Sequence, residues 1–477
     1  MVRTSVIIEA GCDRPAATGQ SRNRPLTRGL FGALVLVGGL TACAPHPSNS
    51  PPDRAELAVA VLPPIKRFAR PHPVAPRISN IDIARDFLDL HFQLESGTQL
   101  PVFTRFDRPI RLRISGNPSA GMRPDLEALL ARLRSEAGIA IALTNADDAE
   151  ITLEAVPRRA ILRASPGAAC FVVPNVASLA EFRRNKRQAR TSWADLRQRQ
   201  RLAIIVPNDV SPQETRDCLH EELAQAIGPL NDLYRLPNSI FNDDNIHTVL
   251  TGFDMLILRA SYAPELRTGM TRSEVATRLP AILARLNPAG ERLPARPLPA
   301  TPRSWIRALE GALAPNRPRH ARLPSAYRAA AIARDLGWRD HRRAFNHYVL
   351  GRILQAEDPD LAQQHFTTAL QVMAGGRDSP ILRARIAAQM AAYDLSQGDG
   401  AQALARLRPA IPVAARAENA GLLATLMLQE AEARYQLGQR ARAHALVLDS
   451  QGWARYGFGP DWGSHRAIVT AAQRQSN

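Results

Sequence analysis

Two kinds of hydrophobic periodicity divide the chain into a mixed first part and a helical second part. Ile110, Leu112 and Ile114 alternate with polar residues, which predicts a half-buried strand over 109–115. A helix is predicted over 122–137, where four leucines recur at helical spacing. Further short apolar runs predict strands over 139–143, 149–156, 170–173 and 202–206.

One helix has unusually clear boundaries. Ser211 is a typical N-cap, Pro212 suits the first helical position, and Glu214 follows three residues after the cap. The helix should end at Gly228, which precedes Pro229. Further helices are predicted over 248–260 and 271–286. Residues 80–286 are therefore expected to form one α+β domain with a mixed sheet.

A second, all-helical domain is expected over 304–477, after a linker over 287–303 that contains five prolines. Three similar segments carry polar turns at Glu357, Gly398 and Gly438, a period of about 40 residues. These segments, over 348–370, 388–407 and 431–448, resemble tetratricopeptide-type helical hairpins. An irregular helical bundle is the alternative.

The N-terminus indicates export. Arginines precede an apolar run over 30–40, which is too short to cross about 30 Å of hydrocarbon as a stable span. The following Leu40-Thr41-Ala42-Cys43 resembles the bacterial lipobox. We expect residues 1–42 to be a signal peptide and Cys43 to carry the lipid that attaches the chain to a membrane. An uncleaved signal anchor is the alternative.

The residues after the predicted lipid site suggest a destination. Ala44 and Pro45 follow Cys43, and by resemblance to known sorting behaviour this points to the periplasmic face of the outer membrane. Residues 43–79 are rich in proline and lack an apolar period, so they are expected to form an extended tether.

The chain is strongly basic. Its formal net charge is +17, and the predicted signal contributes five arginines and two acids, which leaves about +14 for the mature protein. Outside the cytoplasm such a surface would meet anionic lipid or acidic polymers, so we expect no nucleic-acid partner. The basic segment over 183–201 is either a solvated helical insertion or a contact with anionic lipid or glycan.

Two cysteines remain once the signal is removed and Cys43 is lipidated. Cys170 and Cys218 form an even pair in an oxidising compartment, which favours a disulfide between them. Two buried free thiols are the alternative.

The clearly bounded helix also carries the candidate chemistry. Cys218, Glu221, Glu222 and Gln225 share a polar stripe beside an apolar face, and such a stripe either faces solvent or lines a cleft. His220-Glu221 begins like a zinc HExxH motif, but position 224 is alanine, so the second histidine ligand is missing in this register.

A shifted register resembles the metzincin signature HExxHxxGxxH. Glu221, Gln225 and Asn231 stand at the three histidine positions, while Glu222 and Gly228 match the glutamate and the turn glycine. The segment from Ser239 to Asn242 resembles the metzincin Met-turn, with Phe241 at the methionine position. The resemblance covers about residues 105–265, and it implies a degenerate metzincin-like domain.

A second resemblance rests on the same motifs. EExxQxxGxxND, SIFNDD and FDMLILRASYAPELRTGM are similar to a family of uncharacterised proteobacterial lipoproteins, domain of unknown function 2927. That resemblance implies no known activity.

The candidate ligands argue against zinc. Zinc in such sites is held by imidazole nitrogens, whereas Glu221, Gln225 and Asn231 offer only oxygen, with Asp232 as a further carboxylate. Hard oxygen ligands suit calcium or magnesium, and a weakly bound cation of this kind stays open. We expect no cofactor. His247 could approach the helix, whereas His341 and His347 have no metal-like partners.

Three hypotheses follow. The first is a non-catalytic envelope lipoprotein that binds or scaffolds a periplasmic protein through a repurposed cleft and helical repeats. The second is a hydrolase of peptide or cell-wall substrates that uses Glu222 as general base, with a pKa raised by burial next to Glu221. In the third, the first domain is only a spacer and the repeats bind the partner.

Overall fold

The structure is a computed structural model of the 477-residue chain. It describes residues 63–68, 74–242, 244, 246–314, 317–374 and 379–459. The predicted signal over 1–42, the lipidation residue Cys43 and most of the predicted tether lie outside these residues. Within the described ranges, no helix has both the length and the apolar character needed to cross a membrane.

A five-stranded mixed sheet forms the centre of the first part, in the order β2-β1-β3-β5-β4. β2, β1, β3 and β5 run parallel to one another, and β4 pairs antiparallel with β5 at one edge. The strands are β1 (Ile110–Gly116), β2 (Ile141–Leu143), β3 (Ile151–Val156), β4 (Phe171–Pro174) and β5 (Leu202–Pro207). All five lie at the predicted places, so the mixed α/β class is confirmed.

The sheet is buried on both faces in its centre. Successive side chains of a strand point to opposite faces. On β5, Leu202, Ile204 and Val206 therefore join one hydrophobic core, while Ala203 and Ile205 join a second core on the other face. This explains why β5 has a continuous apolar sequence instead of an alternating one.

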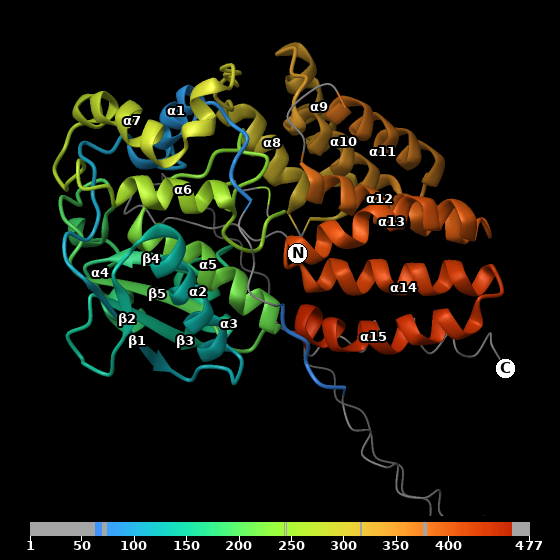
Figure 1. Cartoon of the computed structure of the whole chain (residues 1–477), viewed down its shortest axis with the longest axis horizontal. Coiled ribbons are helices and arrows are strands. Elements are labelled where there is room, and N and C mark those ends of the chain that lie inside the picture. The colour runs from blue at the N-terminus through green and yellow to red at the C-terminus, as the bar shows by residue number, and fades with distance from the viewer. Residues whose placement is uncertain are drawn as a thin grey trace, which may run out of the picture. The chain divides into compact units, whose positions relative to one another are not determined.

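Helices cover both faces of this sheet and extend the first core (Figure 1). α2 (Met122–Ala137), α5 (Pro212–Ile227) and α7 (Arg272–Leu286) match the predicted helices, and α6 (Gly252–Ser261) begins four residues later than predicted. The remaining elements of this part are α1 (Asn80–His91), α3 (Arg158–Ala164), α4 (Leu179–Asn185) and the short 3-10 helices η1 (Ala189–Thr191) and η2 (Pro288–Arg292).

Helix α1 was not among the predicted elements, although the sequence carries its signal. Ser79 caps it by accepting a hydrogen bond from the Asp82 backbone. Ile83, Phe87 and Leu90 recur at helical spacing and are buried in the core. α1 packs against α7, so the chain segment before the sheet completes the same core as the segment after it.

The second part is helical throughout its described residues (Figure 1). Its helices are α8 (Arg303–Leu313), α9 (Arg319–Asp335), α10 (His341–Leu354), α11 (Pro359–Ala374), α12 (Pro380–Ser396), α13 (Gly400–Arg416), α14 (Ala420–Gln436) and α15 (Arg440–Phe458). Consecutive helices pack in pairs, and the predicted turns at Glu357, Gly398 and Gly438 join α10 to α11, α12 to α13 and α14 to α15. The all-helical prediction is confirmed.

The two parts are packed together, because all described residues from Ile65 onward belong to one compact unit. In one contact zone, Arg216 of α5 forms an ion pair with Glu418, and the Tyr456 hydroxyl donates to Asp125 of α2 over 3.0 Å. In the other, Tyr234 packs edge-on against Trp305, and His341 Nε2 lies 2.7 Å from the Tyr234 carbonyl oxygen. The loop between α5 and α6 is therefore held by both parts.

Candidate functional site: buried carboxyl groups on helix α5

Helix α5 begins as predicted and ends in a buried cap. The Ser211 hydroxyl accepts a hydrogen bond from the Glu214 backbone, with Pro212 in the first turn. At the other end, the Arg199 guanidinium donates to the carbonyl oxygens of Gln225, Ala226 and Gly228. Helix C-termini leave carbonyl groups unpaired and attract cations, so Arg199 satisfies both needs.

Most of the basic segment over 183–201 is exposed, as the solvated-insertion interpretation expects, but Arg199 is an exception. Its side chain is buried rather than solvated, and it lies over the ring of buried Trp193. Only α4 and η1 in this segment are helical. Its position in the sequence, among many exposed arginines, carried no signal for this role.

The turn at Gly228 also behaves as expected. A Cβ atom at this position would lie 2.6 Å from Leu258 Cδ2 of α6, so a larger residue would require the Leu258 side chain to shift. The glycine thus allows the chain after α5 to pass close to α6.

The polar stripe of α5 is not a solvent face. Glu222 and Gln225 are each about 1% exposed and Cys218 is fully buried, whereas Glu221 is half-buried. Because Leu219 on the neighbouring face is also in the core, nearly the whole middle of the helix is enclosed. This burial excludes the solvent-face alternative for the stripe.

The predicted disulfide between Cys170 and Cys218 is confirmed. It ties the residue before β4 to α5, one turn ahead of Glu221 and Glu222. The Cys170 sulfur and one carboxylate oxygen of each glutamate all lie within 4.8 Å of one another. A disulfide sulfur is not a thiolate, so this sulfur does not add a metal ligand.

The loop after α5 supplies a further carboxyl to the cluster, and it comes from Asp232. Gln225 Nε2 lies 3.4 Å from Asp232 Oδ2, and Asp232 also hydrogen-bonds Glu95 from the loop after α1. Glu221 and Glu222 both interact electrostatically with Asp232. We call Glu95, Glu221, Glu222 and Asp232 the acidic cluster.

Asn231 points elsewhere. Its side-chain amide donates to the Asp89 carbonyl oxygen over 2.9 Å and so fastens the loop to α1. The three positions that the metzincin resemblance assigns to metal ligands are therefore not equivalent. Glu221 and Gln225 lie at the acidic cluster, while Asn231 holds the loop in place.

Burial and mutual repulsion raise the pKa values in the acidic cluster. The pKa of Glu222 is raised well above its usual value, first by burial and then by Glu221 and Asp232. Burial, with Glu221 and Asp254 adding to it, raises the pKa of Asp232 to about 7, although the hydrogen bond to Glu95 opposes this. Every charged group that shifts these two pKa values is itself a carboxyl.

Ser239 and Phe241 form a turn that is anchored to the start of α6. The Ser239 hydroxyl hydrogen-bonds Asp254, and it accepts from the Phe241 backbone N–H over 3.0 Å. The Phe241 ring is fully buried in the core. Both residues support the floor of the loop, and their side chains bring no metal ligand to the cluster.

The histidines do not join the acidic cluster. His220 Nδ1 accepts from the Leu250 backbone, and His247 Nε2 contacts the Pro237 carbonyl oxygen over 3.2 Å. Burial lowers the pKa of both, that of His247 to about 4, so both are neutral at pH 7. His347 does have a ring partner that the sequence did not reveal, because its Nδ1 lies 3.1 Å from Nδ1 of His365.

The fold and site define a mixed α/β domain with an enclosed acidic helix, packed against helical hairpins. Within it, residues 80–281 match the model of a family described as "Protein of unknown function (DUF2927)". This match supports the predicted domain of unknown function over those residues. No curated protein and no solved structure matches the chain.

Proposed function

We propose that this protein is a non-catalytic lipoprotein of the bacterial envelope that binds or scaffolds a periplasmic protein. In this proposal a degenerate metzincin-like domain provides a rigid base, and the helical hairpins provide the binding surface. The partner that fits best is an acidic protein segment with apolar side chains.

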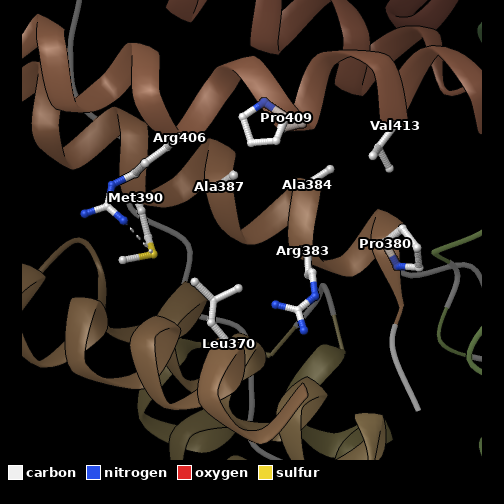
Figure 2. A pocket seen from close by; sticks show the side chains of 10 residues that line it. Leu370, Pro380, Arg383, Ala384, Ala387, Met390, Arg406, Pro409 and Val413 are labelled. Carbon is white, nitrogen blue, oxygen red and sulfur yellow. Dashed lines mark hydrogen bonds between the residues drawn. The ribbon is translucent and has the colours of Figure 1, made fainter. Parts of the chain in front are cut away.

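The observation that carries the proposal is an apolar groove in the helical part (Figure 2). It encloses about 300 Å³ between α11, α12 and α13. Leu370, Ala387, Met390 and Val413 line it, and Arg406 lies at one end beside Met390. Grooves of this size accommodate the side chains of a bound segment.

Charge supports the choice of an acidic partner. A second hollow, between α13, α14 and α15, shares α13 with the first, and exposed Arg408 and Arg442 lie at its edge. With a net charge of +17 on the whole chain, this surface would attract acidic segments and repel basic ones.

The residues on α5 support the part of the proposal in which the α/β domain is a rigid structural base without zinc chemistry. None of the described histidines joins Glu221 and Glu222 in a group that could hold a metal. Asn231 is committed to the Asp89 carbonyl oxygen and Gln225 to Asp232. The helix and its turn therefore keep the order expected from the metzincin resemblance without its imidazole ligands.

A photocrosslinking experiment in cells tests the proposal. A photoreactive amino acid at Ala387, inside the groove, should yield one defined adduct with an acidic envelope protein. The same group at exposed Ala405, on α13 but outside both hollows, is the matched control and should yield none. The double substitution Arg408→Glu/Arg442→Glu should abolish the adduct. Equal adducts at both positions, or an adduct that survives the double substitution, would contradict it.

One observation favours the hydrolase as a second candidate. Burial, together with Glu221 and Asp232, raises the pKa of Glu222, which shifts this carboxyl toward the protonated form that a general acid uses. The substitution Glu222→Gln would then abolish function in a deletion strain. Full complementation by that variant would exclude the hydrolase and leave the binding protein intact.

A further inference from the structure

We propose that Glu221, Glu222 and Asp232 bind a hard divalent cation, for which calcium fits best. The site would lie between α5 and the loop that follows it. This assignment is independent of the apolar groove on the helical part, so it can fail while the partner-binding proposal stands.

The geometry of the carboxylates suits such an ion. One oxygen each from Glu221 and Glu222 lies within 4.8 Å of the other. Calcium binds oxygen at about 2.3–2.6 Å, so two ligands on opposite sides of the ion are about 5 Å apart at most. Gln225, one turn after Glu221, brings Asp232 to the same place through its 3.4 Å contact.

Unsatisfied buried oxygens point to a missing positive charge. Glu222 is about 1% exposed, and its Oε1 atom has no hydrogen-bond partner among the described residues. Oδ1 of Asp232 is also buried and has no hydrogen-bond partner among the described residues. Removing a carboxylate from water without a partner costs several kcal/mol, so buried charges are normally paired or bound to a metal.

Proton sharing explains only part of this arrangement. Asp232 and Glu95 are hydrogen-bonded to each other, which requires one of the two carboxyls to hold a proton. The shared proton lies between Asp232 and Glu95, so Oε1 of Glu222 and Oδ1 of Asp232 still have no donor among the described residues. A cation that displaces the proton would satisfy both oxygens and neutralise the cluster at once.

The donor set selects calcium over zinc. It consists of carboxylates with one amide nearby, it contains no imidazole, and the neighbouring sulfur is held in the disulfide. Calcium tolerates irregular oxygen sets of variable number, whereas magnesium demands near-ideal octahedral geometry. Glu221 and Asp232 are only half-buried, so water can complete the coordination and the ion can enter.

Isothermal titration of the purified chain with calcium chloride, after treatment with EDTA, tests the site. We expect one calcium per chain and a thermal unfolding midpoint that rises with calcium. Glu222→Gln and Asp232→Asn should each weaken binding at least tenfold. Glu214→Gln, which removes the same charge from the first turn of α5, is the matched control and should change the affinity less than twofold.

Several outcomes would overturn the assignment. One is the absence of heat and of any thermal shift with calcium, magnesium or manganese at about 10 mM. Others are binding that both variants retain, or zinc bound in preference to calcium. If Glu222→Gln does not fold, Asp232→Asn decides alone. The asparagine oxygen can still accept from Gln225, and its NH2 group can donate to Glu95, so the hydrogen bond no longer needs a protonated carboxyl.

Discussion

Two buried carboxyl groups in the α/β part have opposite electrostatic environments. Asp86 of α1 is fully buried and pairs with Arg235, whose Nε lies 2.8 Å from its Oδ1. Glu222 of α5 is as deeply buried, but its charged neighbours are Glu221 and Asp232. The first acid has a guanidinium partner, and the second has only other acids.

The difference separates a charge-balanced ion pair from a carboxyl whose charged neighbours are all acids. The Asp86 pair continues through Asp89, which also binds Arg235 and Arg272, so this network ties α1 to the loop after α5 and to α7. Such a pair costs desolvation but keeps its charges balanced. For Glu222 and Asp232, no ion pair among the described residues offsets the cost of burying the carboxyls. Carboxyls with perturbed pKa values of this kind concentrate at functional sites.

Breaking the balanced pair should have the largest effect. Arg235→Met leaves Asp86 buried without its main cation, and we expect the free energy of unfolding to fall by about 3–5 kcal/mol. Urea unfolding followed by circular dichroism measures this. The double variant Asp86→Asn/Arg235→Met should recover part of the loss, and a single variant as stable as the wild type would remove the contrast between the two regions.

The acidic cluster should make the stability of the protein depend on pH, because the charged groups that shift the pKa of Asp232 are themselves carboxyls. The folded-state pKa of Asp232, about 7, lies above its usual value of 3.8. The stability that its proton contributes is therefore fully present below about pH 4 and is lost as the pH rises to about 7, an effect of roughly 2–4 kcal/mol. Urea unfolding in EDTA across this range should detect the loss, and Asp232→Asn should remove it. An identical pH profile in the variant would contradict this account.

Neutralising Glu222 should stabilise the protein where no cation is present. In EDTA at pH 8, Glu222→Gln removes a carboxyl whose ionised form is destabilised by burial and by Glu221 and Asp232, so we expect the free energy of unfolding to rise by about 1–3 kcal/mol. The sign is opposite to that of Arg235→Met, which sharpens the comparison. Thermal and urea unfolding measure it, and a clear loss of stability would mean that Glu222 has a structural partner after all.

The smallest effect is expected at the buried carboxyl of Asp125, which joins the two parts. Tyr456→Phe removes the hydrogen bond to Asp125, and we expect a loss of about 1 kcal/mol. Urea unfolding with Tyr327→Phe as control measures it, since exposed Tyr327 lies on the helical part away from this contact. Equal effects of the two substitutions would show that the hydroxyl contact adds nothing to the docking of the parts.

Local signals account for much of what could be predicted. The boundaries of α5 follow from Ser211, Pro212 and Gly228, which act on the backbone within one turn of themselves. The turns at Gly398 and Gly438 follow in the same way, since both glycines adopt positive φ angles of 76° and 72°. The positions of the strands could also be predicted from the sequence, because an apolar run bounded by polar turns is a local signal.

The candidate site could be predicted only in part. The spacing on α5 places Glu221, Glu222 and Gln225 along one stripe, and Asp232 follows soon after in the chain. Glu95 is far away in sequence, and nothing in its surroundings indicates that it meets Asp232. Asn231 fitted the signature, but its amide is used to hold α1.

The sequence by itself determined which residues form helices, strands and turns, and that Cys170 and Cys218 were available to pair, because these properties depend on neighbours a few residues apart and on residue chemistry. Only the tertiary structure decided which charges are balanced. Asp86 meets Arg235 and Glu222 meets Asp232 because α1, α5 and the following loop pack together. The energy of a buried charge depends on what the fold brings within a few ångströms of it, and a single sequence does not contain those distances.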